Sequence, residues 1–141
     1  KTIAKKLDVQ IIKEPNNLGL SDAIFHSAIT AKAMGFERLC VIPADLAAPL
    51  ASDLIAMLNS EAPVTICPSA DLGTNALVVS PPDAIPFRYG SRSSLSHLHE
   101  ANEKGIRARV MKLDSFTFDI DTNKCLARAK RVVPEIAGVC A

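Results

Sequence analysis

Short apolar runs alternate with amphipathic segments of helical length along this chain, and this pattern decides the fold class. Runs such as residues 38–43 and 64–67 are apolar almost throughout, as strands covered on both faces are. Residues 21–34 carry apolar side chains at helical spacing, and Gly35 follows them. The expected strands are residues 9–13, 38–43, 64–67, 76–79, 107–113 and 116–121, and the expected helices are residues 2–7, 21–34, 51–58, 94–103 and 122–132. We predict a single three-layer α/β domain over residues 1–141 with a mostly parallel sheet.

Carboxylates stand at the ends of two of these apolar runs. Asp45 follows residues 38–43, and Asp119 and Asp121 close the run that starts at Ser115. Alternation along a strand places Asp119 and Asp121 on one face, about 6–7 Å apart, where they repel each other unless a cation or hydrogen-bond donors lie between them. Oxygen ligands of this kind suit Mg²⁺ beside phosphate groups. We therefore expect a metal site at the carboxyl ends of the strands; turn and helix-cap carboxylates are the alternative.

A polar segment between two expected strands offers a further contact. Residues 71–75 contain Gly73 and Thr74. They form either a simple turn, which their composition favours, or a site where backbone amides and the Thr74 hydroxyl meet a phosphate or a base.

A second polar segment precedes the helix of residues 94–103. Ser93 is expected to cap this helix, and Arg88 and Arg92 nearby would make its N-terminus an anion site; the alternative is a capping serine beside two exposed arginines. His97 follows Ser93 by one helical turn. It faces the same pocket or is an ordinary half-buried surface histidine, and the second interpretation is favoured.

Composition argues against two classes of partner. The net charge of this 141-residue chain is +1, and it has no Trp and one Tyr, which leaves little to attract or stack nucleic acid. No apolar run approaches 18 residues, so we expect no membrane partner. The four cysteines show no metal-ligand spacing, and Cys40 and Cys67 lie inside apolar runs. We expect reduced thiols in a cytoplasmic protein.

Several motifs, taken in chain order, together resemble one family. They are Leu18-Gly19-Leu20, residues 41–46, 73–77 and 81–90, Ser93 with His97, and Phe118-Asp119-Ile120-Asp121-Thr122. These motifs resemble the 2-phospho-L-lactate guanylyltransferase family of deazaflavin coenzyme (coenzyme F-420) biosynthesis, within the MobA-like nucleotidyltransferases. The resemblance covers nearly the whole chain. The run from Gly73 to Gly90 is its most discriminating part, because the strand-end aspartates occur in many nucleotidyltransferases.

The resemblance implies a Rossmann-like nucleotidyltransferase fold and a specific reaction. The enzyme would join the GMP part of GTP to the phosphate of 2-phospho-L-lactate, phosphoenolpyruvate or a related phosphoacid, and release pyrophosphate. The catalytic residues it implies, which would also hold Mg²⁺, are Asp45, Asp119 and Asp121, and the substrate-binding residues are Thr74, Gly90 and Ser93.

The resemblance also concerns the extent of the chain. Members of the family begin with a further strand, a nucleotide-binding loop and a helix–strand unit before the position of Thr2, so we expect the domain to be incomplete at its amino-terminal end. The edge of the sheet would then need a neighbour, such as a second copy in a homo-oligomer. Two other interpretations stay open: a MobA-like nucleotidyltransferase for a sugar phosphate or a pterin, and a non-catalytic α/β module that binds a nucleotide or a partner.

Overall fold

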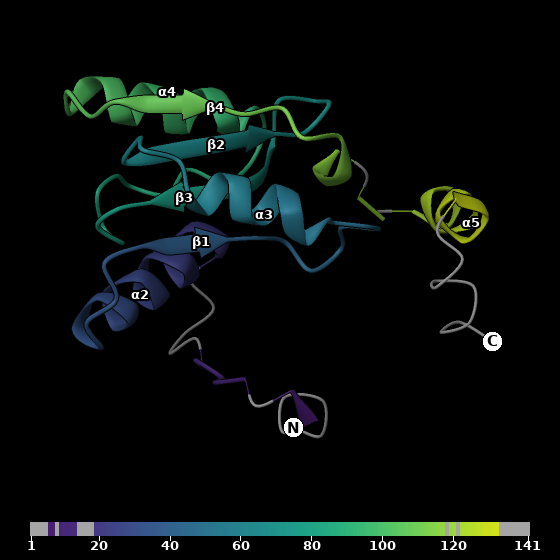
Figure 1. The fold of residues 1–141 in the computed structure, drawn as a ribbon, viewed down its shortest axis with the longest axis horizontal. Helices are drawn as coiled ribbons and strands as arrows, with labels where there is room; N and C mark the ends of the chain where they lie inside the picture. Colours follow the sequence, from purple (N-terminus) through teal and green to yellow (C-terminus); the bar gives the residue numbers. More distant parts are fainter. Residues whose placement is uncertain (1–5, 8, 14–18, 118, 121, 133–141) are drawn as a thin grey trace.

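Four short strands form one sheet between helices in the part of the chain that the computed structural model describes, residues 6–7, 9–13, 19–117, 119–120 and 122–132 (Figure 1). The elements are α2 (Leu20–Ala33), β1 (Leu39–Val41), α3 (Ala51–Leu58), β2 (Val64–Pro68), β3 (Thr74–Val79), α4 (Ser93–Glu103), β4 (Ala108–Val110), the 3-10 helix η1 (Asp114–Phe116) and α5 (Asn123–Val132). Helix α3 packs on one face of the sheet, and α2 and α4 pack on the other. The predicted α/β class is confirmed.

The sheet is mixed, so the expectation of a mostly parallel sheet is wrong for the described strands. The strand order is β1–β3–β2–β4; β3 pairs antiparallel with β1 and β2, and β4 pairs parallel with β2. The turn between β2 and β3 is too short for the crossover that parallel neighbours need. Because β1, β2 and β4 point the same way, their carboxyl ends and the amino end of β3 lie at one edge of the sheet (Figure 1).

The two central strands are buried on both faces. Every residue of β2 and β3 is buried. On one face Ala28 of α2 and Ala101 of α4 pack with Leu77, and on the other Met57 of α3 and Phe116 pack with the alternate side chains of the strands. Burial of a large apolar side chain contributes about 1.5–3 kcal/mol. This packing fixes the end of β3, where the candidate site lies.

Glycines follow the ends of two helices. Gly35 after α2 and Gly105 after α4 have φ values of +87° and +64°, in the left-handed region that favours glycine. The start of α4 differs from the expectation. Arg92, with a φ of +54°, precedes the helix, and Ser93 is its first residue, with no side-chain cap. The prediction that Ser93 caps α4 is therefore wrong.

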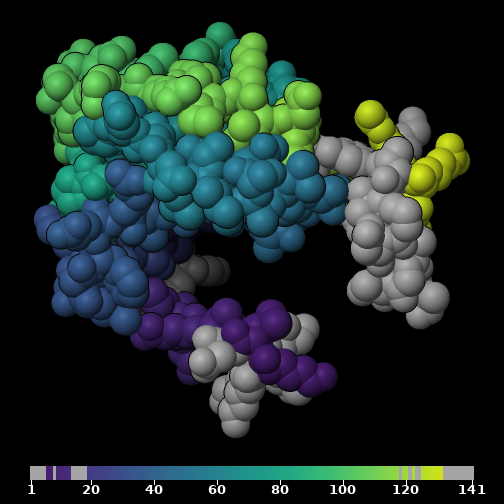
Figure 2. All heavy atoms as spheres, in the orientation of Figure 1, coloured from purple at the N-terminus to yellow at the C-terminus, as the bar shows by residue number. Residues whose placement is uncertain are grey.

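Two of the expected strands do not form in the described residues. Residues 9–13 pair with no strand, Val9 and Ile11 are more than half exposed, and a hollow separates this purple segment from α3 in Figure 2. Over residues 116–121, the chain forms the end of η1 and then a single bridge from Asp119 to Leu46; Phe118 and Asp121 lie outside the described residues. An apolar run becomes a strand only where a neighbouring strand can accept its hydrogen bonds.

Two cysteines lie in the interior, as predicted. Cys67 is buried and Cys40 half-buried, and burial raises the pKa of both, that of Cys40 to about 11. Both side chains are therefore neutral thiols at pH 7. Among the described residues, every helix is too short or too polar to span a membrane.

Candidate active site

A cavity of about 420 Å³ opens at the edge of the sheet where β1 ends and β3 begins. Its walls come from residues 41–45, the start of β3, the first turns of α2 and two loop residues. Its polar lining is Asp45, Thr74, Asn75, Tyr89 and Asp119, and the remaining wall is apolar. Three residues that the sequence analysis singled out, from segments far apart in the chain, thus lie on one cavity.

Backbone pairing holds the segments of Asp45 and Asp119 side by side. The backbone N–H of Ile120 donates to the carbonyl oxygen of Asp45 at 2.9 Å, and Leu46 and Asp119 form an antiparallel bridge. Asp45 is exposed and Asp119 is half-buried. The third predicted carboxylate, Asp121, lies outside the described residues.

The carboxylates of Asp45 and Asp119 are of the ligand type that a hard divalent ion prefers. Mg²⁺ binds through one or two carboxylates, with waters and substrate phosphates as its other ligands. In the described ranges, no group of three His, Cys, Asp or Glu side chains is placed to hold a metal. The assignment of Asp45, Asp119 and Asp121 as metal ligands therefore stays a prediction.

On the β3 side of the cavity, a hydrogen-bond network fixes Thr74. Its Oγ1 lies 3.0 Å from Ser93 Oγ and 3.1 Å from His97 Nδ1. The backbone N–H of Arg88 donates to Nε2 of the same imidazole at 2.9 Å. Thr74, Ser93 and His97 are 8%, 2% and 0% exposed. The network thus joins the first residue of β3, the first two turns of α4 and the loop before α4.

His97 is an interior residue, so its interpretation as a half-buried surface histidine is wrong. Burial lowers its pKa to about 4, although the charge of nearby Glu100 acts in the opposite direction. The imidazole is therefore neutral at pH 7. The sequence held one signal for this position: Ser93 and His97 are four residues apart and share a helix face.

Tyr89 is a site residue that the sequence analysis did not single out. Its backbone N–H donates to Ser21 Oγ of α2 at 2.9 Å, and its ring packs edge-on against His97 with the ring centres 5.0 Å apart. The hydroxyl is buried, and no group in the described residues bonds to it. A buried hydroxyl without a partner is costly. The only sequence signal was a lone tyrosine in a polar loop.

Gly90 follows Tyr89 but does not line the cavity wall. Its φ of +136° lies in the region that favours glycine, and its carbonyl oxygen accepts a hydrogen bond from the Ser93 N–H at 3.2 Å. Gly90 therefore shapes the turn that leads into α4 and brings Ser93 to Thr74.

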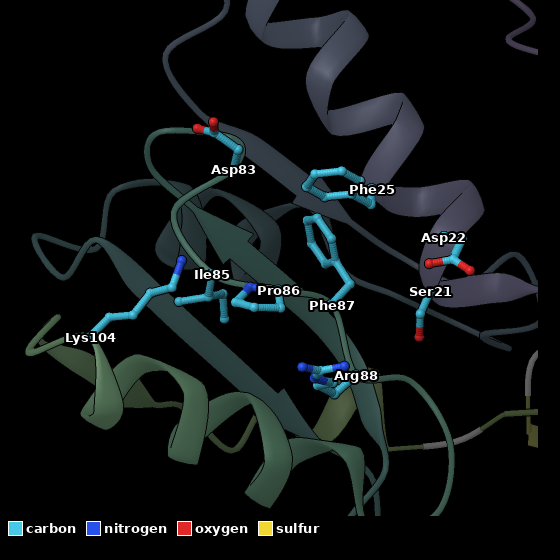
Figure 3. Close-up of a pocket in the computed structure, with 9 residues that line it drawn as sticks. All are labelled: Ser21, Asp22, Phe25, Asp83, Ile85, Pro86, Phe87, Arg88 and Lys104. Atoms are coloured by element: carbon cyan, nitrogen blue, oxygen red, sulfur yellow. The ribbon is translucent and has the colours of Figure 1, made fainter.

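At the start of α4, where an anion site was one of two interpretations, the first backbone N–H groups form hydrogen bonds within the chain. The Ser94 N–H is already bonded to the Leu72 carbonyl oxygen at 3.0 Å. Arg88 Nε pairs with Glu100 at 2.6 Å, and its side chain lines a different cavity, between α2 and α4 (Figure 3). Arg92 is exposed. Neither arginine lines the cavity that contains Thr74.

The comparisons with known proteins agree with the motifs. A family model described as "Guanylyl transferase CofC like" matches residues 2–128. The chain belongs to this guanylyltransferase family. It is 42% identical over 108 residues to the 3-phospho-D-glycerate guanylyltransferase of Colwellia psychrerythraea, covering 74% of this chain and 51% of that protein.

A second relative and a solved structure extend the comparison. The chain is 33% identical over 122 residues to the 2-phospho-L-lactate guanylyltransferase of Methanothermobacter thermautotrophicus, covering 85% of this chain and 53% of that protein. The chain thus spans about half the length of the relatives that it matches. Its fold is similar to that of a Desulfovibrio desulfuricans protein described as a nucleotide-diphospho-sugar transferase, with a TM-score of 0.63, 16% identity and coverage of 76% of this chain and 48% of that one.

Proposed function

We propose that this chain carries the acceptor and metal side of a guanylyltransferase. The reaction joins the GMP part of GTP to the phosphate of 2-phospho-L-lactate, phosphoenolpyruvate or a related phosphoacid, such as 3-phospho-D-glycerate, for deazaflavin coenzyme biosynthesis. The observation that supports it best is the shared cavity, which has Asp45 and Asp119 on one part of its wall and Thr74 on another. The family and the names of its relatives support the substrate class.

The chemistry needs two kinds of group at this place. Asp45, Asp119 and Asp121 would hold Mg²⁺, which when bound neutralises phosphate charge and positions phosphate oxygens. The hydroxyl of Thr74, supported by Ser93, would bind the phosphoacid. An oxygen of the acceptor phosphate then forms a bond to the α-phosphorus of GTP while the bond from this phosphorus to the pyrophosphate oxygen breaks. Holding the two reactants in line supplies much of the rate.

The test compares acceptors and nucleotides directly. The chain is incubated with GTP and Mg²⁺ and with 2-phospho-L-lactate, phosphoenolpyruvate, 3-phospho-D-glycerate or glucose 1-phosphate, and the guanylylated product is identified by mass spectrometry. We expect product from at least one phosphoacid, less with ATP in place of GTP, and none from the sugar phosphate. Product from glucose 1-phosphate alone would replace this proposal by a sugar nucleotidyltransferase.

A further inference from the structure

The imidazole of His97 can carry its proton on only one nitrogen. A neutral imidazole has one N–H donor and one acceptor nitrogen. The backbone N–H of Arg88 is a fixed donor, 2.9 Å from Nε2, so Nε2 must be the acceptor. The proton therefore lies on Nδ1, which donates to Thr74 Oγ1 at 3.1 Å. A main-chain amide of the loop thus decides the tautomer of a buried side chain.

This tautomer leaves the Thr74–Ser93 pair with one more hydroxyl proton than its own hydrogen bond uses. The two hydroxyls contain two protons, and one of them is used in the 3.0 Å hydrogen bond between them. His97 accepts neither, since its Nδ1 is itself a donor. The other proton is left for a third partner, and Thr74 lines the cavity while Ser93 and His97 are almost entirely buried.

We propose that His97 is a positioning residue that directs one hydroxyl proton of the Thr74–Ser93 pair into the cavity, so that the site prefers an anionic oxygen of the acceptor. This inference rests on the proposed function, because it assumes that a phosphoacid binds in this cavity. With the opposite tautomer, Thr74 would donate to His97, and the pair would present lone pairs to the ligand. An oxygen of a phosphate or carboxylate would then meet no donor there.

The first test observes the tautomer itself and needs no activity. Long-range ¹H–¹⁵N correlation spectra of the labelled chain at pH 7 distinguish the two ring nitrogens. We expect a protonated Nδ1 and an unprotonated Nε2 for His97, and the spectrum of the exposed His99 serves as an internal comparison. A protonated Nε2, or an imidazolium at pH 7, would overturn the proposal.

The second test removes one hydrogen bond of His97 at a time. In His97→Gln the side-chain amide lies where Nε2 lay, so it can accept from the Arg88 N–H but cannot donate to Thr74. In His97→Asn the amide lies near the position of Nδ1, so it can donate to Thr74. We expect His97→Gln to raise the Kd for phosphoenolpyruvate, measured by calorimetry with Mg²⁺, about tenfold. His97→Asn should recover most of this loss, and the KM for GTP should stay unchanged in both. His99→Gln is the matched control.

The outcomes separate this inference from the proposed function. Equal Kd values for His97→Gln and His97→Asn would mean a merely structural role and would overturn the inference, while phosphoenolpyruvate binding by the wild type would still support the proposed function. A wild-type chain with the expected tautomer that binds no phosphoacid would contradict both. Should His97→Gln fail to fold, as judged by circular dichroism, the tautomer spectrum and the Kd of Thr74→Val, which removes the directed proton, decide the question.

Discussion

At the scale of single residues, the buried imidazole of His97 makes stability depend on pH. In the folded chain its pKa is about 4, compared with 6.5 for an ordinary histidine. The unfolded chain therefore takes up a proton more readily between these two values. The contribution of the neutral His97 imidazole to the free energy of unfolding is complete above pH 6.5 and is lost as the pH falls towards 4. We expect the free energy of unfolding to fall by about 1 kcal/mol per pH unit from this residue alone.

Urea unfolding at pH 7, 6 and 5 measures this dependence. Other groups titrate in the same range, so the informative quantity is the difference between variants. His97→Gln should lose about 1 kcal/mol per pH unit of the wild-type slope, and His99→Gln should keep it. Equal slopes for wild type and His97→Gln would mean that His97 is not a buried neutral group.

The carboxylate of Asp119 belongs to the reaction and not to the fold, according to the proposed function. Asp119 is half-buried beside Asp45, and its backbone makes the bridge that holds the segment. Asp119→Asn keeps the shape and removes the charge. We expect turnover to fall by about 100-fold or more, with the free energy of unfolding within about 0.5 kcal/mol of wild type. Asp114→Asn, at an exposed position outside this cavity, is the control; an active Asp119→Asn enzyme would remove this residue from the metal site.

Single positions also show what the sequence could predict. Asp45 and Thr74 could be named from the sequence because strand-end carboxylates and a Gly–Thr segment are local patterns, and the structure places both on one cavity. The burial of His97 and of the Tyr89 hydroxyl depends on which other segments pack against them in the folded chain. No local pattern contains that information. The roles of Asp45, Thr74 and the other predicted site residues stay predictions.

At the scale of elements, the tight turn between β2 and β3 sets the position of Thr74. Ser69 N–H donates to the Gly73 carbonyl oxygen at 3.1 Å, and the Ser69 hydroxyl donates to the Asp71 carboxylate. A Cβ on Gly73 would lie 2.7 Å from Ser69 Oγ but 3.8 Å from Ser69 Cβ. A methyl group on Gly73 would therefore clash with the Ser69 hydroxyl unless that hydroxyl rotated away from Asp71, and it would also lie 3.3 Å from Asp71 Oδ1.

Gly73→Ala should therefore destabilise the chain by about 1–3 kcal/mol, as overpacking does, and it should weaken phosphoacid binding because it displaces Thr74. The double variant Ser69→Ala, Gly73→Ala should recover most of the stability in thermal unfolding, with Ser69→Ala alone as the reference. If the double variant were no more stable than Gly73→Ala, the contact with Ser69 would not be the cause.

The helices were easier to predict than the strands. The helices over residues 51–58 and 94–103 begin and end within one residue of the prediction, because spacing and glycine stops are local. The antiparallel direction of β3 relative to β2 follows from the short turn between them, which is visible in the sequence. The pairing of β3 with β1 is not visible there. Residues 116–121 alternate like a strand, yet in the described part of this segment the chain forms the end of η1 and one bridge, from Asp119 to Leu46.

At the scale of the whole molecule, the site depends on long-range order. Residues 45, 74 and 119 meet only because the end of β1, the start of β3 and the segment after η1 lie at the same end of the sheet. In the described residues, β1 pairs with β3 alone, so its other edge is open to a further strand. The chain also spans about half the length of its relatives. The homo-oligomer and the contribution of further residues to GTP binding stay predictions.

The central claim is that this cavity supports metal-dependent transfer of GMP to a phosphoacid. The most direct measurement is pyrophosphate release by the chain with GTP, Mg²⁺ and phosphoenolpyruvate or 2-phospho-L-lactate, beside a reaction with EDTA. We expect release that requires both the phosphoacid and the metal. A folded chain that releases no more pyrophosphate than its EDTA control with every acceptor, both as these 141 residues and when extended at their amino-terminal end, would contradict it.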